Sequence, residues 1–133
     1  MVSIIYIYPY VNYESIRIKQ IQAILNDNYI PNNLFEFKSD EYIDDSILIK
    51  LGDSKLVCFV LYGISKVGNL GTRIKELFPS ILLMFECDNI NDDYKDLLEK
   101  HNEIDFIALG NSGYSIVDFL EKYDGENTEL LVN

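Results

Sequence analysis

Short apolar runs alternate with segments of helical periodicity along the whole chain, and this alternation constrains the fold more than any other feature. The apolar runs lie at 4–8, 33–37, 56–61, 81–85 and 104–109. Apolar residues at helical spacing follow them near 13–26, 43–51, 67–77, 90–98 and 116–120. Successive strands joined through helices need crossover connections, which place parallel strands in one sheet with helices on both faces. The sequence therefore predicts an α/β fold with three layers, α/β/α, in a doubly wound arrangement.

The strand order and the number of domains follow from the same pattern. Flavodoxin-like windings place the first and third strands side by side, so we expect a five-stranded parallel sheet in the order 2-1-3-4-5. Residues 129–132 could add a sixth, edge strand or lead into a further domain. A length of 133 residues suits one domain with its own core and is too short for an added catalytic barrel. We therefore expect residues 1–133 to form a single domain.

The charge balance limits the classes of partner. The chain has 22 acidic and 11 basic residues, for a net charge of −11. This charge repels nucleic-acid phosphates and anionic lipids, so we expect neither nucleic-acid nor membrane binding. The apolar runs are shorter than a membrane span, and the N-terminus lacks a signal-peptide pattern. With only Cys58 and Cys87, too few for a disulfide framework, the sequence predicts a cytoplasmic protein with reduced thiols.

The loops that leave the strands hold the candidate ligand-binding residues, because open parallel sheets bind ligands at the carboxyl ends of their strands. Tyrosine rings suit stacking, hydroxyl and amide groups suit hydrogen bonding, and a Gly-rich turn before a helix suits an anion. The candidates are Tyr10, Asn12, Tyr62, Gly63, Ser65, Glu86, Gly110, Asn111, Ser112 and Gly113, with Ser112 as the expected helix cap. Ordinary strand-to-helix turns explain many of the same residues, and both interpretations stay open.

Several other polar residues are expected to be structural. Asp44-Asp45 and Asp92-Asp93 lie in first turns of helices, where capping and the helix dipole explain them without a metal. His101 follows a helix and is expected to face solvent. Gly68 and Gly71 are expected to let the helix or the preceding loop approach another group closely; packing on the sheet is favoured, and contact with a ligand is the alternative. The sequence contains no acid/base pair, nucleophile triad or phosphate-binding loop, so we expect no catalytic and no metal-binding residues.

Residues 55–123 resemble the cobalamin-binding domain that precedes the catalytic barrel of many radical SAM enzymes. The run K-L-V-C-F-V at 55–60 stands where that family reads P-D-L-V-G-F-S, and I-K-E-L-F-P at 74–79 stands where it reads I-K-E-L-N-P. The run I-D-F-I-A-L-G at 104–110 corresponds to V-D-Y-V-V-R-G. The resemblance implies a cobalamin-binding-like domain of the Rossmann type.

The chain departs from this family at its ligand-binding motifs. The family's serine after the third strand is Val60, its paired glycines are Glu86-Cys87, and the first loop lacks the D-x-H-x-x-G motif that supplies the lower axial histidine. A glutamate and a cysteine in place of glycines are expected to fill the channel of the nucleotide tail. Two distant cysteines cannot supply the C-x-x-x-C-x-x-C triplet of a radical SAM cluster. Our leading expectation is therefore that the domain holds no cofactor, and the alternative is that it holds cobalamin.

Three functional hypotheses follow. The first is a non-catalytic, cobalamin-binding-like domain that supports or recognises the substrate of a radical SAM-type enzyme, in the same chain or another; its partners are that enzyme, a peptide or a small polar substrate. The second is a genuine module for cobalamin or a small ligand at the carboxyl edge of the sheet. The third, a receiver-like signalling domain, requires an acidic pair after the first strand and an Asp ending the third. Because those places carry Pro9-Tyr10 and Leu61-Tyr62, we set the third hypothesis aside.

Overall fold

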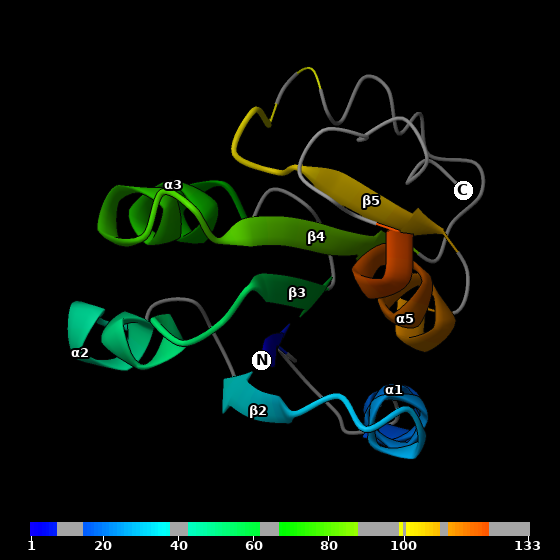
Figure 1. Ribbon diagram of the computed structural model, residues 1–133. Coiled ribbons are helices and arrows are strands. Elements are labelled where there is room, and N and C mark those ends of the chain that lie inside the picture. Colours follow the sequence, from blue (N-terminus) through cyan, green and yellow to red (C-terminus); the bar gives the residue numbers. More distant parts are fainter. Residues whose placement is uncertain are drawn as a thin grey trace.

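The computed structural model describes residues 1–7, 15–37, 43–61, 67–87, 99, 101–109 and 112–122. Its strands are β1 (Val2–Ile7), β2 (Asn32–Phe37), β3 (Leu56–Leu61), β4 (Leu82–Cys87) and β5 (Phe106–Leu109). Its helices are α1 (Ser15–Asp27), α2 (Asp45–Leu48), α3 (Val67–Leu77) and α5 (Ser112–Lys122), with a 3-10 turn, η3 (Ile49–Leu51), directly after α2. The strands pair in parallel in the order β2-β1-β3-β4-β5 (Figure 1), which confirms the predicted sheet.

Two hydrophobic clusters lie on opposite faces of this sheet. Helices α1 and α5 cover one face, while α2 and α3 cover the other (Figure 1). Successive residues of β1 separate accordingly: Ile4 and Tyr6 belong to the cluster with α1 and α5, whereas Ile5 belongs to the cluster with α2 and α3. The three-layer arrangement is therefore confirmed. No helix of the described segments is long and apolar enough to cross a bilayer.

The ends of two elements differ from the sequence prediction. The expected helix at 43–51 consists of the short α2 followed by η3, because Asp44 caps α2 and leaves Ile43 before the helix. The fifth strand begins at Phe106 rather than at residue 104. Ile43 and Ile104 are nevertheless buried. Their apolar side chains therefore indicate that they belong to the core, and not that they belong to a helix or a strand. The expected helix at 90–98 and sixth strand at 129–132 lie outside the described residues.

A set of polar contacts ties α3 to the amino ends of β4 and β5. The carboxylate of Asp105 accepts hydrogen bonds from Lys75 Nζ at 2.6 Å and from the backbone N–H of Leu83 at 2.9 Å. Lys75 Nζ also donates to the carbonyl of Ile81 at 2.8 Å. Both charged side chains are largely shielded from water, where hydrogen bonds to ions contribute more than at an exposed surface. We call these contacts the amino-end network.

Close packing beside this network explains one of the two helix glycines. A Cβ atom on Gly71 would lie 2.6 Å from Glu103 Cγ and 3.4 Å from Leu83 Cδ1. Since real Cβ atoms do not approach so closely, Gly71 lets α3 lie against the sheet and the segment before β5. The packing role predicted for Gly71 is confirmed, and that of Gly68 stays a prediction.

Replacing Asp105 with Ala should destabilise the protein by about 2 kcal/mol, because it removes two hydrogen bonds to a carboxylate and leaves the Lys75 ammonium without that partner. Urea unfolding followed by circular dichroism measures the change. Asp118→Ala is the matched control, since it removes an exposed pair with Lys122 on α5, and should cost less than about 0.5 kcal/mol. Equal losses in the two variants would contradict a special contribution of the amino-end network.

Candidate functional site

The strands that precede the candidate ligand-binding loops all end at one edge of the sheet. In the parallel register Ile7 of β1 pairs with Leu61 of β3, and Cys87 of β4 pairs with Leu109 of β5. The segments that follow these strands therefore all begin at the carboxyl edge. This edge contains the point where the winding changes direction, between β1 and β3, which is the usual ligand position in such sheets.

Only part of the candidate site falls within the described structure. Seven of the predicted residues lie outside it and remain predictions: Tyr10, Asn12, Tyr62, Gly63, Ser65, Gly110 and Asn111. Glu86, Ser112 and Gly113 are described. Ser112 is the first residue of α5, so it lies inside the helix and not before it, where a cap would stand.

Glu86 is a buried acidic residue at this edge. It is 5% exposed and pairs with Ala108 of the neighbouring strand. Because side chains alternate along a strand, Glu86 projects to the same face as Met84, the face covered by α1 and α5. A carboxyl group is therefore buried on this face of β4, at the position where the cobalamin-binding domains that the sequence resembles have a glycine.

Gly113 has a packing role between two helices. A Cβ atom there would lie 2.8 Å from Ile24 Cδ1 and 3.3 Å from the Cα atom of Ile21, so the first turn of α5 rests directly on α1. This close approach explains a glycine at the start of a helix, where it otherwise weakens the helix. Its predicted contact with a ligand remains untested.

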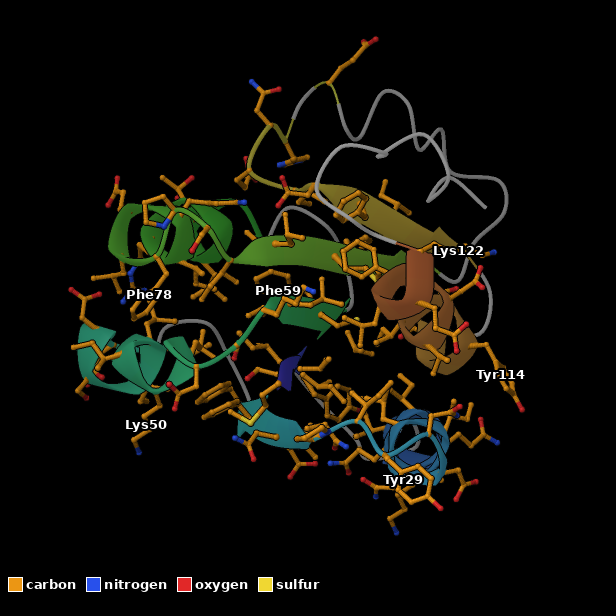
Figure 2. All side chains as sticks on the ribbon, in the orientation of Figure 1. Tyr29, Lys50, Phe59, Phe78, Tyr114 and Lys122 are labelled. Carbon is orange, nitrogen blue, oxygen red and sulfur yellow. The ribbon has the colours of Figure 1, made fainter. Side chains whose placement is uncertain are left out.

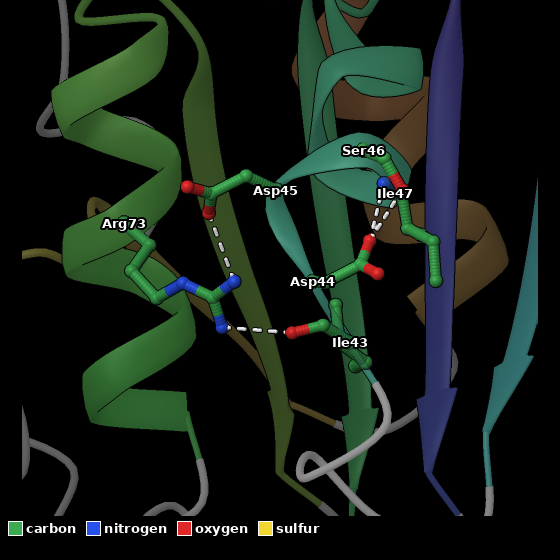
Figure 3. A network of polar contacts seen from close by, with 6 residues as sticks. All are labelled: Ile43, Asp44, Asp45, Ser46, Ile47 and Arg73. Carbon is green, nitrogen blue, oxygen red and sulfur yellow. Dashed lines mark hydrogen bonds and ion pairs between the residues drawn. The ribbon is translucent and has the colours of Figure 1, made fainter.

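The acidic pair Asp44-Asp45 forms structural contacts, as the sequence predicted (Figure 3). Asp44 caps α2: its carboxylate accepts hydrogen bonds from the Ser46 hydroxyl at 2.5 Å and from the Ile47 N–H at 3.1 Å. Asp45 pairs with Arg73 of α3 at 3.0 Å, and Arg73 also donates to the carbonyl of Ile43 at 2.9 Å. Capping of α2 therefore accounts for Asp44 and the ion pair with Arg73 accounts for Asp45, while Asp92-Asp93 lies outside the described residues.

The expectation for His101 is wrong. Its side chain is only 22% exposed, and its Nδ1 atom lies 3.3 Å from Oε1 of Glu103. The turn between His101 and Ile104, closed by a backbone hydrogen bond of 3.1 Å, holds the two residues together. Sequence spacing did not indicate this pair, because it depends on the turn.

An open depression of about 480 Å³ lies at the opposite edge of the sheet from the candidate site. It is lined by Thr72, Lys75, Glu76, Asn102, Glu103 and Asp105. The sequence analysis did not identify this set; the signal available was Asp105, one charged residue inside an apolar run. Within the described segments, no three His, Cys, Asp or Glu side chains are placed to hold a metal ion.

Comparison with known proteins bears on the fold. No family model and no curated protein matches the chain. Among solved structures, the non-phosphorylated receiver domain of the stress response regulator RcsB from Escherichia coli matches with a TM-score of 0.52 and 17% sequence identity. The match covers 91% of this chain and 88% of that one. The chain has a flavodoxin-like, receiver-like fold.

The receiver-like fold agrees with the Rossmann-type architecture that the resemblance implied, and it gives no support to the cobalamin or radical SAM part of that resemblance. At 17% identity the likeness extends to the fold alone. At the place where a receiver is expected to end its third strand in Asp, β3 ends in Leu61. The architecture is therefore shared without the acidic residue at this point.

Removing the Asp44 cap should weaken the protein in a pH-dependent way. The hydrogen bonds from Ser46 and the Ile47 N–H hold the pKa of Asp44 below its ordinary value near 3.8. A carboxyl whose pKa is depressed by folding stabilises the protein above its unfolded pKa, and this contribution is lost as the pH falls through the folded pKa. Urea midpoints of Asp44→Ala should therefore lie below those of the wild type at pH 7 and converge with them towards about pH 2.

Asp44→Asn is the matched variant for this experiment. Asn retains a side-chain oxygen that accepts the Ile47 N–H, so its loss at pH 7 should be smaller than that of Ala. A difference between Asp44→Ala and the wild type that stays constant over the whole pH range would show that the ionised cap is not its cause.

Proposed function

We propose that this chain is a non-catalytic binding domain that uses the carboxyl edge of a receiver-like sheet. The observation that carries the proposal is the end of β3 at Leu61, in register with Ile7 of β1. An aliphatic side chain can neither accept a phosphoryl group nor transfer a proton. At these two strand ends the sequence therefore has aliphatic residues in place of a phosphoryl acceptor or a proton-transfer group.

The burial of Glu86 supports the further proposal that cobalamin is not held tightly. A nucleotide tail lies against a backbone only where side chains leave it room. Glu86 is buried where glycine would leave that room, and its carboxyl group would meet the phosphate of the tail at a cost in free energy. The resemblance to radical SAM enzymes then suggests a supporting role, in which the domain recognises a substrate or the enzyme itself.

Charge indicates the chemistry of the partner. A net charge of −11 favours cationic or neutral partners over phosphate-rich ones. We therefore propose a peptide or a small polar substrate, recognised in the cytoplasm.

A second candidate function is a module that holds cobalamin or another small ligand in its own right. The convergence of β1 and β3 at the carboxyl edge favours it, since this is the ligand position of doubly wound sheets. Under this hypothesis the tyrosine and amide side chains of the loops, Tyr62 and Asn111 among them, would hold the ligand.

Calorimetric titration with cobalamin separates the two candidates. We expect no measurable binding to the wild-type protein, and a colourless protein after purification, because Glu86 and Cys87 replace the paired glycines and no axial histidine is present in the first loop. A dissociation constant in the micromolar range or tighter would support the second candidate and overturn the first.

Two further measurements complete the test. Incubation with acetyl phosphate, followed by intact mass spectrometry, should give no phosphorylated protein, and addition of a phosphoryl group would contradict a non-catalytic sheet edge. The paired substitution Glu86→Gly and Cys87→Gly, checked for folding by circular dichroism, should leave at most weak cobalamin binding through the tail. Binding by this variant but not by the wild type would identify the two side chains as the obstruction.

A further inference from the structure

The outer side of β2 is an unpaired strand edge as far as the described residues extend. Among the described strands, β2 is the last of the sheet and pairs only with β1. In the view of Figure 2 it is the lowest strand, between the labelled Tyr29 on one side and Lys50 on the other. An edge strand presents its remaining main-chain N–H and C=O groups to whatever lies beside the sheet.

The register identifies the main-chain groups that point outwards. The carbonyl of Pro31 accepts a hydrogen bond from the N–H of Val2 at 3.0 Å, so it points towards β1. Successive residues of a strand direct their main-chain groups to alternate sides. The N–H and C=O groups of Asn32, Leu34 and Glu36 therefore point away from β1. We call them the outer groups of β2.

The amino end of this edge is held in place. The Asn32 side chain accepts a hydrogen bond from Gln22 Nε2 at 3.2 Å and donates one to Asn26 Oδ1 at 2.9 Å, which ties β2 to α1. It also donates to the carbonyl of Ile30 at 3.0 Å. A strand that is fixed before it binds loses little conformational entropy on binding, so the outer groups are ready to pair.

The side chains beside the outer groups offer apolar surface on both faces of the strand. Leu34 is partly buried against the layer of α1 and α5, whereas Phe35 and Phe37 are partly buried against the layer of α2 and α3. Neighbouring strands of a sheet pair their side chains on the same face. An added strand with apolar residues opposite these three would therefore bury the apolar surface that β1 and the helices leave exposed.

Glu36 selects the charge of an added strand. It is exposed and is the one charged residue of β2, which has no proline or lysine to block its edge. Opposite charges that face each other across a strand pair are favourable, and like charges are destabilising. A second copy paired through β2 would offer no cation to Glu36, because β2 has no basic residue. A strand of another protein with Lys or Arg at this position would satisfy the carboxylate.

We propose that the outer side of β2 binds an extended segment of a partner protein by adding it to the sheet as a further strand, with a basic residue opposite Glu36 and apolar residues on either side of it. The outer groups of β2 provide main-chain hydrogen bonds, which an extended polypeptide matches. This edge runs along the side of the sheet, whereas the proposed function uses the carboxyl ends of the strands, so neither depends on the other.

The test is a titration of the ¹⁵N-labelled protein with the peptide Thr-Val-Val-Lys-Val-Val-Thr, capped at both ends, followed by NMR. Its sequence is symmetric about Lys, so the same side chains meet β2 in either strand direction. Shift changes should saturate and centre on β2. Amide hydrogen exchange of Leu34 and Glu36 should slow at saturation, whereas that of Asn33 and Phe35, whose N–H groups face β1, should stay unchanged.

Variants at one position separate main-chain pairing from charge. Glu36→Pro removes an outward N–H but no group that faces β1, and it should abolish binding. Glu36→Gln keeps this N–H and should weaken binding about two- to five-fold, as expected for one cross-strand charge pair. Glu36→Lys should reverse the preference, so that the same peptide with Glu in place of Lys binds more tightly. This reversal tests the proposal even if Glu36→Pro does not fold.

Glu121→Gln is the matched control, because it makes the same chemical change at an exposed position of α5, and it should leave the affinity unchanged. N-methylation of the peptide valines removes main-chain donors and should abolish binding. Folded Glu36→Pro that binds as tightly as the wild type, or the absence of saturable shift changes at millimolar peptide, would overturn the proposal. A concentration-dependent dimer in sedimentation that Glu36→Pro dissociates would overturn it in favour of pairing between two copies of β2.

Discussion

The central strands β1 and β3 carry buried side chains on both of their faces, and the rest of the structure depends on this double burial. Cys58 and Val60 face the layer of α1 and α5, whereas Val57 and Phe59 face the layer of α2 and α3. Each fully buried large apolar side chain contributes roughly 1.5–3 kcal/mol relative to exposure. A sheet with one bare face would lose half of that contribution, so helices on both sides are a requirement of these strands.

The two edges of the sheet differ in how their polar groups are arranged. At the amino edge, side chains bond to each other and to the backbone: Ser3 and Ser54 share a buried hydrogen bond of 2.6 Å, and Asp105 joins Lys75 to Leu83 N–H. These contacts hold neighbouring elements in fixed positions. At the carboxyl edge the strands end in apolar residues such as Leu61. In this architecture recognition usually takes place on loops that a rigid scaffold positions.

Sequence patterns identified those elements whose two ends carry a local signal. The segment at 56–61 follows the Gly52-Asp53 turn, and the helix at 67–77 ends before Pro79; both agree with β3 and α3. The patterns failed where the evidence was not local. The Lys75–Asp105 and His101–Glu103 pairs arise from folding, the first across 30 residues and the second through a turn. The location of the candidate site at the carboxyl edge could be predicted, because parallel strands end together at one edge of the sheet. The contacts of the loop residues could not be predicted, because they depend on tertiary structure that no spacing in the sequence specifies.

The position of β1 between β2 and β3 also has a consequence for folding during synthesis. One side of β1 pairs with Asn32–Phe37 and the other with Leu56–Leu61. A growing chain therefore holds its first strand with an unsatisfied hydrogen-bonding edge until residue 61 has left the ribosome. Exposed edges of this kind recruit other strands. The net charge of −11 opposes the approach of a second copy to this edge before β3 arrives.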